Sequence, residues 1–227
     1  LISYLEPDIM YRLTTFIPND PLFKYQWPLY NIRQFSGLQQ ADIDILSCWE
    51  QQKGTRKIIL AIIDTGIDYN HPELKSNIWQ NEKEIPNNGL DDDGNGYIDD
   101  IHGWNFWEKN NDPQDLSGHG THIAGILGAA VNNGIGISGV NWEISLMPLK
   151  CFSPQGFAFL SDILPAIKYA VDNGAQIINA SWGAYSYSQA LQEMLEYAQS
   201  KGVLVVAAAG NNNLNTDTTP FYPACYP

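Results

Sequence analysis

Basic residues are scarce in this chain of 227 residues, which has 12 Lys and Arg against 25 Asp and Glu and a formal net charge of -13. Nucleic acids and anionic membranes are bound mainly through basic surfaces, so the composition predicts neither kind of partner. An acidic surface instead suits a secreted, soluble protein that binds cations. We expect a monomer.

Cysteine is also rare, with only Cys48, Cys151 and Cys225. The three residues have no C-x-x-C spacing, so neither a zinc ribbon nor a dithiol redox motif is predicted, and we expect buried free thiols. No run reaches the roughly 18 apolar residues of a membrane span. The chain begins with Leu and lacks a basic stretch followed by an apolar core, so we expect any signal peptide to precede Leu1.

The length suits one domain built around a sheet that is covered on both faces. Four apolar runs are continuous rather than alternating, which predicts buried parallel strands. Helical patterns alternate with them, one with Ser161 as its expected N-cap, and this predicts an α/β fold with a three-layer, doubly wound, mostly parallel sheet. The strands are expected at 57–63, 144–149, 175–180 and 203–209, and the helices at 41–52, 119–131, 161–172 and 188–200.

Polar residues follow three of the predicted strands, namely Asp64, Ser181 and Asn211. The carboxyl ends of parallel strands share one edge of the sheet, where ligands bind. Asp64 could orient an imidazole through its Nδ1 proton, His119 could act as a general base, and Asn211 could donate its amide to a developing oxyanion.

Simpler explanations exist for each of these residues. Asp64 could cap a helix or serve in a phosphotransfer Asp-x-Gly motif, and Asn211 could belong to an ordinary turn. His119 and His122 could bind a metal, but no third ligand with zincin spacing is found, and His122 is interpreted as a packing residue.

Carboxylates and amides alternate in the segment 87–102 as in a calcium-binding loop, with Gly96 at the sharp turn. The last position of such a loop holds His102 instead of the usual Glu, so Asp100 or a distant group has to complete the shell. Alternating carboxylates repel one another without a cation, which favours calcium over a solvated acidic turn. The candidate ligands are Asp91, Asp93, Asn95, Tyr97 and Asp99.

Two long motifs, with Asp ahead of His in the chain, make this sequence resemble the subtilisin-like serine peptidases, the subtilases. The order fits neither the α/β-hydrolases nor the chymotrypsin-like enzymes. The resemblance covers 18–227. The Asp motif consists of Ile63-Asp64-Thr65-Gly66-Ile67-Asp68 together with His71-Pro72-Glu73-Leu74, and the His motif is Gly118-His119-Gly120-Thr121-His122-Ile123-Ala124-Gly125.

The resemblance implies a secreted, calcium-stabilised serine endopeptidase that cleaves polypeptides, with Asp64, His119 and Asn211 as catalytic residues. It also implies two chain segments that pair with the substrate backbone, 156–159 and 181–183, with Trp182 and Phe159 shaping an apolar pocket. The residues implied to bind substrate are Gly156, Phe159, Ser181, Trp182, Gly183, Ala208 and Gly210.

Calcium is the one cofactor that the resemblance implies, at a tight site of the thermitase-like branch in addition to the loop above. Glu73 stands there in place of the expected aspartate, which keeps the charge and lengthens the side chain. Ala184, after Gly183, replaces a more usual glycine. The implied ligands of the tight site are Asp20, Glu73, Asn133 and the carbonyls of Ala130, Ile135 and Ile137.

The family's nucleophile motif, Gly-Thr-Ser-x-Ala, stands roughly a hundred residues beyond the oxyanion Asn and is not found here. Ser117 and Ser181 do not match it, so residues 1–227 alone are expected to lack turnover. We expect 1–17 to be the end of an inhibitory propeptide with its linker, and 18–227 to be about two thirds of a peptidase domain, with the fold incomplete at the C-terminus.

Two other functions remain open from the sequence. The first is a non-catalytic, calcium-dependent, peptide-binding pseudo-peptidase. The second is an ATP-using phosphotransferase built on Asp-Thr-Gly.

Overall fold

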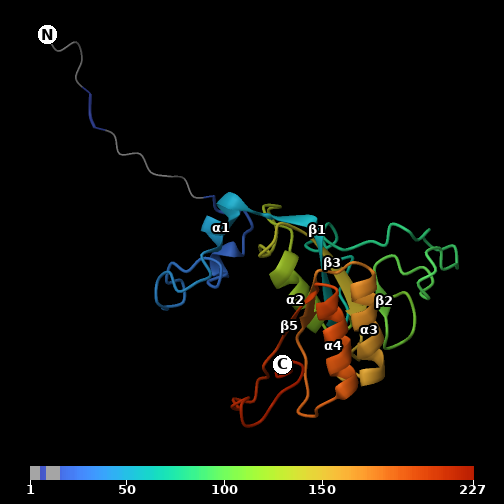
Figure 1. The fold of residues 1–227 in the computed structure, drawn as a ribbon. Coiled ribbons are helices and arrows are strands. Elements are labelled where there is room, and N and C mark those ends of the chain that lie inside the picture. The colour runs from blue at the N-terminus through green and yellow to red at the C-terminus, as the bar shows by residue number, and fades with distance from the viewer. Residues whose placement is uncertain (1–5, 9–15) are drawn as a thin grey trace.

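The computed structural model describes residues 6–8 and 16–227 (Figure 1). Most of the predicted propeptide strand therefore lies outside the described residues. Within these residues, four α-helices and five strands follow a short 3-10 helix at Phe23–Tyr25. The helices are α1 (Ile45–Gln51), α2 (His119–Gly128), α3 (Leu160–Asp172) and α4 (Gln189–Ser200), and the strands are β1 (Gly54–Asp64), β2 (Trp104–Asn105), β3 (Glu143–Lys150), β4 (Ile177–Ala180) and β5 (Leu204–Ala207).

The five strands form one sheet in the order β2-β3-β1-β4-β5, and every pair in it is parallel. The chain winds from β1 towards the β2 edge and then, after β3, crosses to the opposite side of β1. Asp64 is the last residue of β1, the strand at which the winding reverses. Ligands of open α/β sheets bind in the crevice at such a point.

Helices cover both faces of the sheet (Figure 1). Leu60 and Ile62 of β1 pack with Ala124 of α2 in one cluster. Ala61 and Ile63 point the other way, into a separate cluster formed with α3 and α4. Successive side chains of a strand point to opposite faces, so an unbroken apolar run is what two covered faces require. The predicted three-layer α/β fold is confirmed.

Some predicted details of the elements are wrong. The helix predicted from Ser161 begins at Leu160 after Phe159, which caps it without a side-chain hydrogen bond. Ser188, by contrast, caps α4 by accepting a hydrogen bond of 3.3 Å from the backbone N of Leu191. Strand β2 was not predicted, because two residues are too few to show a periodicity.

Strand β5 also differs from the prediction of two covered faces. It lies at an edge of the sheet, and its Leu204 and Val206 side chains are 60% and 51% exposed. The apolar character of this short run therefore predicts a strand, but it does not predict whether both faces of that strand are buried.

Two further predictions from the sequence concern the cysteine thiols and membrane-spanning helices. All three cysteines are free; Cys151 is buried, whereas Cys48 is exposed, contrary to the prediction for that residue. Across 6–8 and 16–227, no helix combines the length and the apolar character that spanning a membrane requires.

Candidate active site

Asp64 and His119 meet at the carboxyl edge of the sheet. Asp64 is 2% exposed, and its Oδ1 lies 2.7 Å from Nδ1 of His119, the first residue of α2. The same oxygen accepts a hydrogen bond of 2.7 Å from the backbone N of Thr65. An ionised Asp64 requires the proton of the neutral imidazole to be on Nδ1, which leaves Nε2 as the acceptor. Because the His119 side chain is 57% exposed, it is accessible as a general base.

A glycine makes this approach possible. A Cβ on Gly120 would stand 2.1 Å from the backbone O of Gly66 and 3.2 Å from Oδ1 of Asp64. Any side chain at this position would therefore push α2 away from β1. The backbone N of Gly120 also donates a hydrogen bond of 3.1 Å to Oγ1 of Thr65, which ties the start of the helix to the end of the strand.

A groove of about 350 Å³ begins at the Asp64–His119 pair. Four of the predicted substrate-binding residues line it together with this pair, and the rings of Phe152 and Trp182 lie 6.1 Å apart within the lining. The structure thus brings residues of both predicted substrate segments to the Asp64–His119 pair. The four residues are Gly156, Ser181, Trp182 and Gly183.

Phe159 does not share this lining. Its exposed ring stacks on Trp107, with centroids 5.8 Å apart and an interplanar angle of 5°. The aromatic partner of Trp182 in the groove is Phe152, in place of the predicted Phe159. The sequence alone does not show which of the two phenylalanines lies beside Trp182, because Phe152 and Phe159 flank the same loop.

The other predicted site residues follow β5. The backbone N of Ala208 donates a hydrogen bond of 3.0 Å to the O of Ala180 and so extends the β4–β5 pairing. Gly210 has a φ of 94°, a backbone conformation that favours glycine. Asn211 comes next and is exposed, at the same edge of the sheet as Asp64.

The segment after Gly183 is tied to the end of the described chain. Ala184 and Tyr222 exchange two backbone hydrogen bonds of 2.8 Å each. A Cβ on Gly183 would lie 2.3 Å from Cε1 of Phe221, so this position requires glycine. The groove wall at 181–183 is therefore supported by residues 221–222.

The predicted tight calcium site gathers two buried carboxylates at one loop. Asp20 accepts hydrogen bonds from the backbone N of Asn132 and Asn133 at 2.8 and 2.9 Å. Glu73 lies 3.5 Å from Nδ2 of Asn133, through its Oε1, while its buried Oε2 has no hydrogen-bond partner among the described residues.

Burial raises the pKa of the Glu73 carboxyl, and the nearby Asp20 raises it further. An unpaired buried carboxylate oxygen is costly, and a cation would offset that cost. The donor set therefore fits calcium. The predicted carbonyl donors Ala130, Ile135 and Ile137 belong to the same 130–138 segment.

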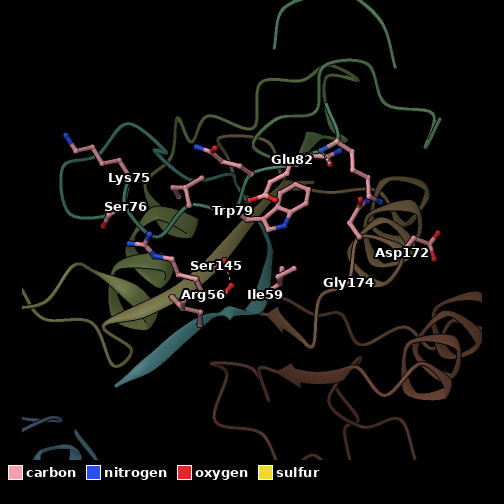
Figure 2. A pocket seen from close by; sticks show the side chains of 15 residues that line it. Arg56, Ile59, Lys75, Ser76, Trp79, Glu82, Ser145, Asp172 and Gly174 are labelled. Carbon is pink, nitrogen blue, oxygen red and sulfur yellow. Dashed lines mark hydrogen bonds between the residues drawn. The ribbon is translucent and has the colours of Figure 1, made fainter. Parts of the chain in front are cut away.

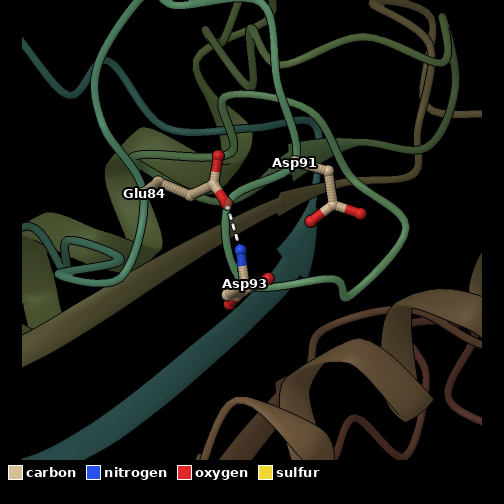
Figure 3. Close-up of side chains that lie close together, drawn as sticks. All are labelled: Glu84, Asp91 and Asp93. Carbon is tan, nitrogen blue, oxygen red and sulfur yellow. Dashed lines mark hydrogen bonds between the residues drawn. The ribbon is translucent and has the colours of Figure 1, made fainter.

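A second acidic cluster forms in the 84–100 segment. One carboxylate oxygen from each of Glu84, Asp91 and Asp93 lies within 4.8 Å of the other two (Figure 3). Glu84 is buried and accepts hydrogen bonds from the backbone N of Asp92 and Asp93, at 2.9 and 3.2 Å. Three carboxylates this close favour a hard cation with oxygen ligands. Glu84 was missed because it precedes the loop motif.

The other predicted residues of this loop have protein partners. Asp99 accepts hydrogen bonds from the backbone N of Asn88 and Gly89, at 3.1 and 2.9 Å. Asn95 donates to the buried Asp100 at 2.9 Å and accepts at 2.8 Å from the backbone N of Tyr97. Asp91 and Asp93 also accept hydrogen bonds of 3.1 Å each from the backbone N of Asn95, and in addition they lie with Glu84.

A cavity of about 730 Å³ lies elsewhere (Figure 2). Its lining includes Arg56 near the start of β1, Ser145 near the start of β3 and Asp172 at the end of α3. It is therefore at the amino ends of the strands, opposite to Asp64, and contains none of the predicted site residues.

Known proteins are similar to this chain over most of its length. Over its full length, the chain is 35% identical to a thermophilic serine proteinase of Bacillus sp. (strain AK1), of which it covers 47%. It is 34% identical over 93% of its length to thermitase of Thermoactinomyces vulgaris, of which it covers 63%. The chain thus spans less than two thirds of either relative.

The fold is also similar to a solved structure, that of fervidolysin from Fervidobacterium pennivorans, a keratinolytic enzyme related to subtilisin. The TM-score is 0.61 at 30% identity, over 80% of this chain and 25% of that chain. The family model described as Peptidase_S8, subtilase family, matches residues 55–227. The matched residues include Asp64, His119 and the other residues that line the groove. The chain therefore belongs to the subtilase family.

Proposed function

We propose that the full-length protein containing this chain is a secreted, calcium-stabilised serine endopeptidase that cleaves polypeptides. The observation that carries the proposal is the 2.7 Å contact between Asp64 Oδ1 and His119 Nδ1 at the head of the groove. The subtilase relatives and the acidic composition support it. The acidic composition suits a secreted protein and so supports that part of the proposal.

In this proposal Nε2 of His119 takes the proton from a serine hydroxyl as its oxygen attacks the scissile carbonyl. Asp64 keeps the imidazole in the required tautomer and stabilises its charged form, and His119 then gives the proton to the leaving amine. The side-chain amide of Asn211 donates a hydrogen bond to the oxyanion, a type of contact worth about 3 kcal/mol of barrier. The serine is supplied by sequence outside residues 1–227.

The substrate is an extended polypeptide held between the segments at Gly156 and at 181–183. A strand-like peptide between two chain segments gains its affinity from backbone hydrogen bonds and its specificity from side-chain pockets. The rings of Phe152 and Trp182 line the groove, which supports an apolar residue upstream of the cleaved bond. Residues 1–17 are proposed to be the end of a propeptide that occupies the same groove before maturation.

Calcium has a structural role in the proposal. Asp20, Glu73 and Asn133, with carbonyls of the 130–138 segment, would hold one ion, and Glu84, Asp91 and Asp93 would contribute to holding a second. Bound calcium supplies positive charge that holds these acidic loops together. The same loops lie in the segments that follow β1 and α2, so calcium is expected to stabilise the domain without taking part in proton transfer.

The experiment is an assay of the full-length protein on an unfolded polypeptide, with residues 1–227 alone assayed in parallel. The full-length protein should cleave the substrate and lose activity on treatment with a serine-directed phosphonate, and the shorter chain should show no turnover. Calcium-dependent binding of the polypeptide without cleavage would instead support the pseudo-peptidase. Sequencing the reading frame past Pro227 should reveal Gly-Thr-Ser-x-Ala, and a frame without it would refute the proposal.

A further inference from the structure

Asp115, in the loop before α2, accepts four hydrogen bonds from residues that flank His119. It is 8% exposed. Its Oδ1 accepts from the backbone N of Ser117 at 2.8 Å and of Gly118 at 3.0 Å. Its Oδ2 accepts from the backbone N of Thr121 at 3.0 Å and from the hydroxyl of Thr121 at 2.7 Å. One carboxylate thus fixes the backbone on both sides of His119.

The same network reaches the segment that follows Asp64. Oγ1 of Thr121 accepts a hydrogen bond of 2.9 Å from the backbone N of Asp68. The backbone N of Asp115 donates to the O of Ile67 at 3.3 Å. Asp115 therefore lies between the chain segments that carry the two members of the Asp64–His119 pair.

The ionised form of Asp115 is the stable one. Burial by itself raises the pKa of this carboxyl, but the hydrogen bonds from Thr121, Gly118 and Ser117 outweigh it, and the net pKa is lowered. A negative charge before the first turn of α2 also interacts favourably with the helix dipole.

We propose that Asp115 is a positioning residue of the peptidase: it fixes the first turn of α2 and so keeps Nδ1 of His119 in hydrogen-bonding reach of Asp64. The inference rests on the proposed function. More than half of the His119 side chain is exposed, so packing alone does not hold the ring. Its position depends on its backbone and on the 2.7 Å bond to Asp64.

The test is Asp115→Asn in the full-length protein. An amide at this position points its NH2 group at the donors of Thr121 or at those of Ser117 and Gly118, so at least one pair of hydrogen bonds is lost. We expect kcat to fall about tenfold to a hundredfold with little change in KM, because a small misplacement of a catalytic group mainly slows the reaction. The matched control is Asp112→Asn, which should keep its kcat. Among the described residues, the exposed side chain of Asp112 accepts hydrogen bonds only from the hydroxyl of Tyr69 and the backbone N of Gln114.

Two further measurements separate positioning from loss of folding. The low-field proton NMR signal of the Nδ1 proton of His119, identified by its absence in His119→Ala, should shift or broaden in Asp115→Asn while the thermal transition stays cooperative. If Asp115→Asn does not fold, two variants of Thr121 test the positioning role instead. Thr121→Val should lower kcat, and Thr121→Ser, which keeps the hydroxyl, should recover most of the loss.

The outcomes distinguish the two proposals. An inactive wild-type protein would refute the proposed function. An active wild type, with His119→Ala inactive but Asp115→Asn equal to wild type in kcat and in the NMR signal, would refute the positioning role alone. Equal losses in Thr121→Val and Thr121→Ser would also count against it.

Discussion

A single carboxylate oxygen of Asp64, Oδ1, accepts a hydrogen bond from the backbone N of Thr65 and is also in hydrogen-bonding contact with Nδ1 of His119. Removing a carboxylate from water is costly unless charged or polar partners replace the solvent. Here the partners come from the adjacent residue and from the first residue of α2, so the charge is held in a fixed orientation. These two partners explain how a carboxylate at the end of an apolar strand can be buried and still be held next to the imidazole.

Asp64→Asn tests this orientation. An amide donates through its NH2 group and favours the imidazole tautomer with the proton on Nε2, which cannot accept a proton from serine. In the full-length protein we expect kcat to fall on the order of 10⁴-fold with little change in KM. Steady-state kinetics measure the change, with Asp112→Asn as control. A loss smaller than about tenfold would contradict the assigned role.

The lowered pKa of Asp115 predicts a contribution to stability in acid. A carboxyl whose folded pKa lies below its ordinary value of 3.8 stabilises the fold fully above that value. The contribution is lost as the pH falls below 3.8 and through the folded pKa. Urea unfolding of the full-length protein from pH 6 down to about pH 3 should show a smaller acid-side loss in Asp115→Asn than in wild type. Parallel curves for the two proteins would refute it.

At the scale of elements, two glycines of α2 have opposite surroundings. A Cβ on Gly120 would meet the backbone O of Gly66 at 2.1 Å, whereas one on Gly125 meets only the flexible Cδ1 of Ile137 at 3.6 Å. Gly120→Ala should destabilise by about 1–3 kcal/mol, because strand and helix must separate. Gly125→Ala should be neutral or stabilising by up to about 1 kcal/mol, from helix propensity. Chemical denaturation measures the change in the free energy of unfolding for each variant. Equal changes for Gly120→Ala and Gly125→Ala would contradict the close approach of α2 to β1.

The acidic loop gives a prediction about calcium. Removing calcium with a chelator should lower Tm, since an ion present at a hundred times its Kd stabilises by about 2.7 kcal/mol. Glu84→Gln should reduce the rise in Tm that added calcium produces. Glu82→Gln, an exposed neighbour, should leave that rise as in wild type. A calcium response unchanged by Glu84→Gln would place the ion elsewhere.

The elements with long apolar patterns were predictable because their burial repeats along the chain. The run ending at Asp64 and the pattern after His119 gave β1 and the start of α2. Strand β2 has two residues and no pattern to detect. Ser161 has the right chemistry for an N-cap, but α3 begins one residue earlier, at Leu160, after Phe159.

The site was predictable to the extent that its residues belong to contiguous motifs. The sequence predicted Asp64, His119 and the segment 181–183. It did not reveal Glu84, Phe152 or Asp115, whose roles depend on contacts between segments rather than on spacing. Local patterns therefore identify chemical groups, while their partners require the fold.

At the scale of the whole molecule, the winding of the sheet produces the site. Strands β1, β4 and β5 are neighbours in the sheet although long stretches of chain separate β1 from the other two. Their carboxyl ends bring Asp64, Ser181 and Asn211 to one edge. The helix that starts at His119 approaches the same edge from one face, and α3 and α4 cover the other face (Figure 1).

The most direct test of this account is the rate at which the full-length protein cleaves an unfolded polypeptide, compared with that of its His119→Ala variant in calcium-containing buffer. The account predicts cleavage by the wild type and a loss of roughly 10⁴-fold or more in the variant, because the general base is gone. Cleavage by the variant at the wild-type rate, or no cleavage by either protein while both fold cooperatively, would contradict it.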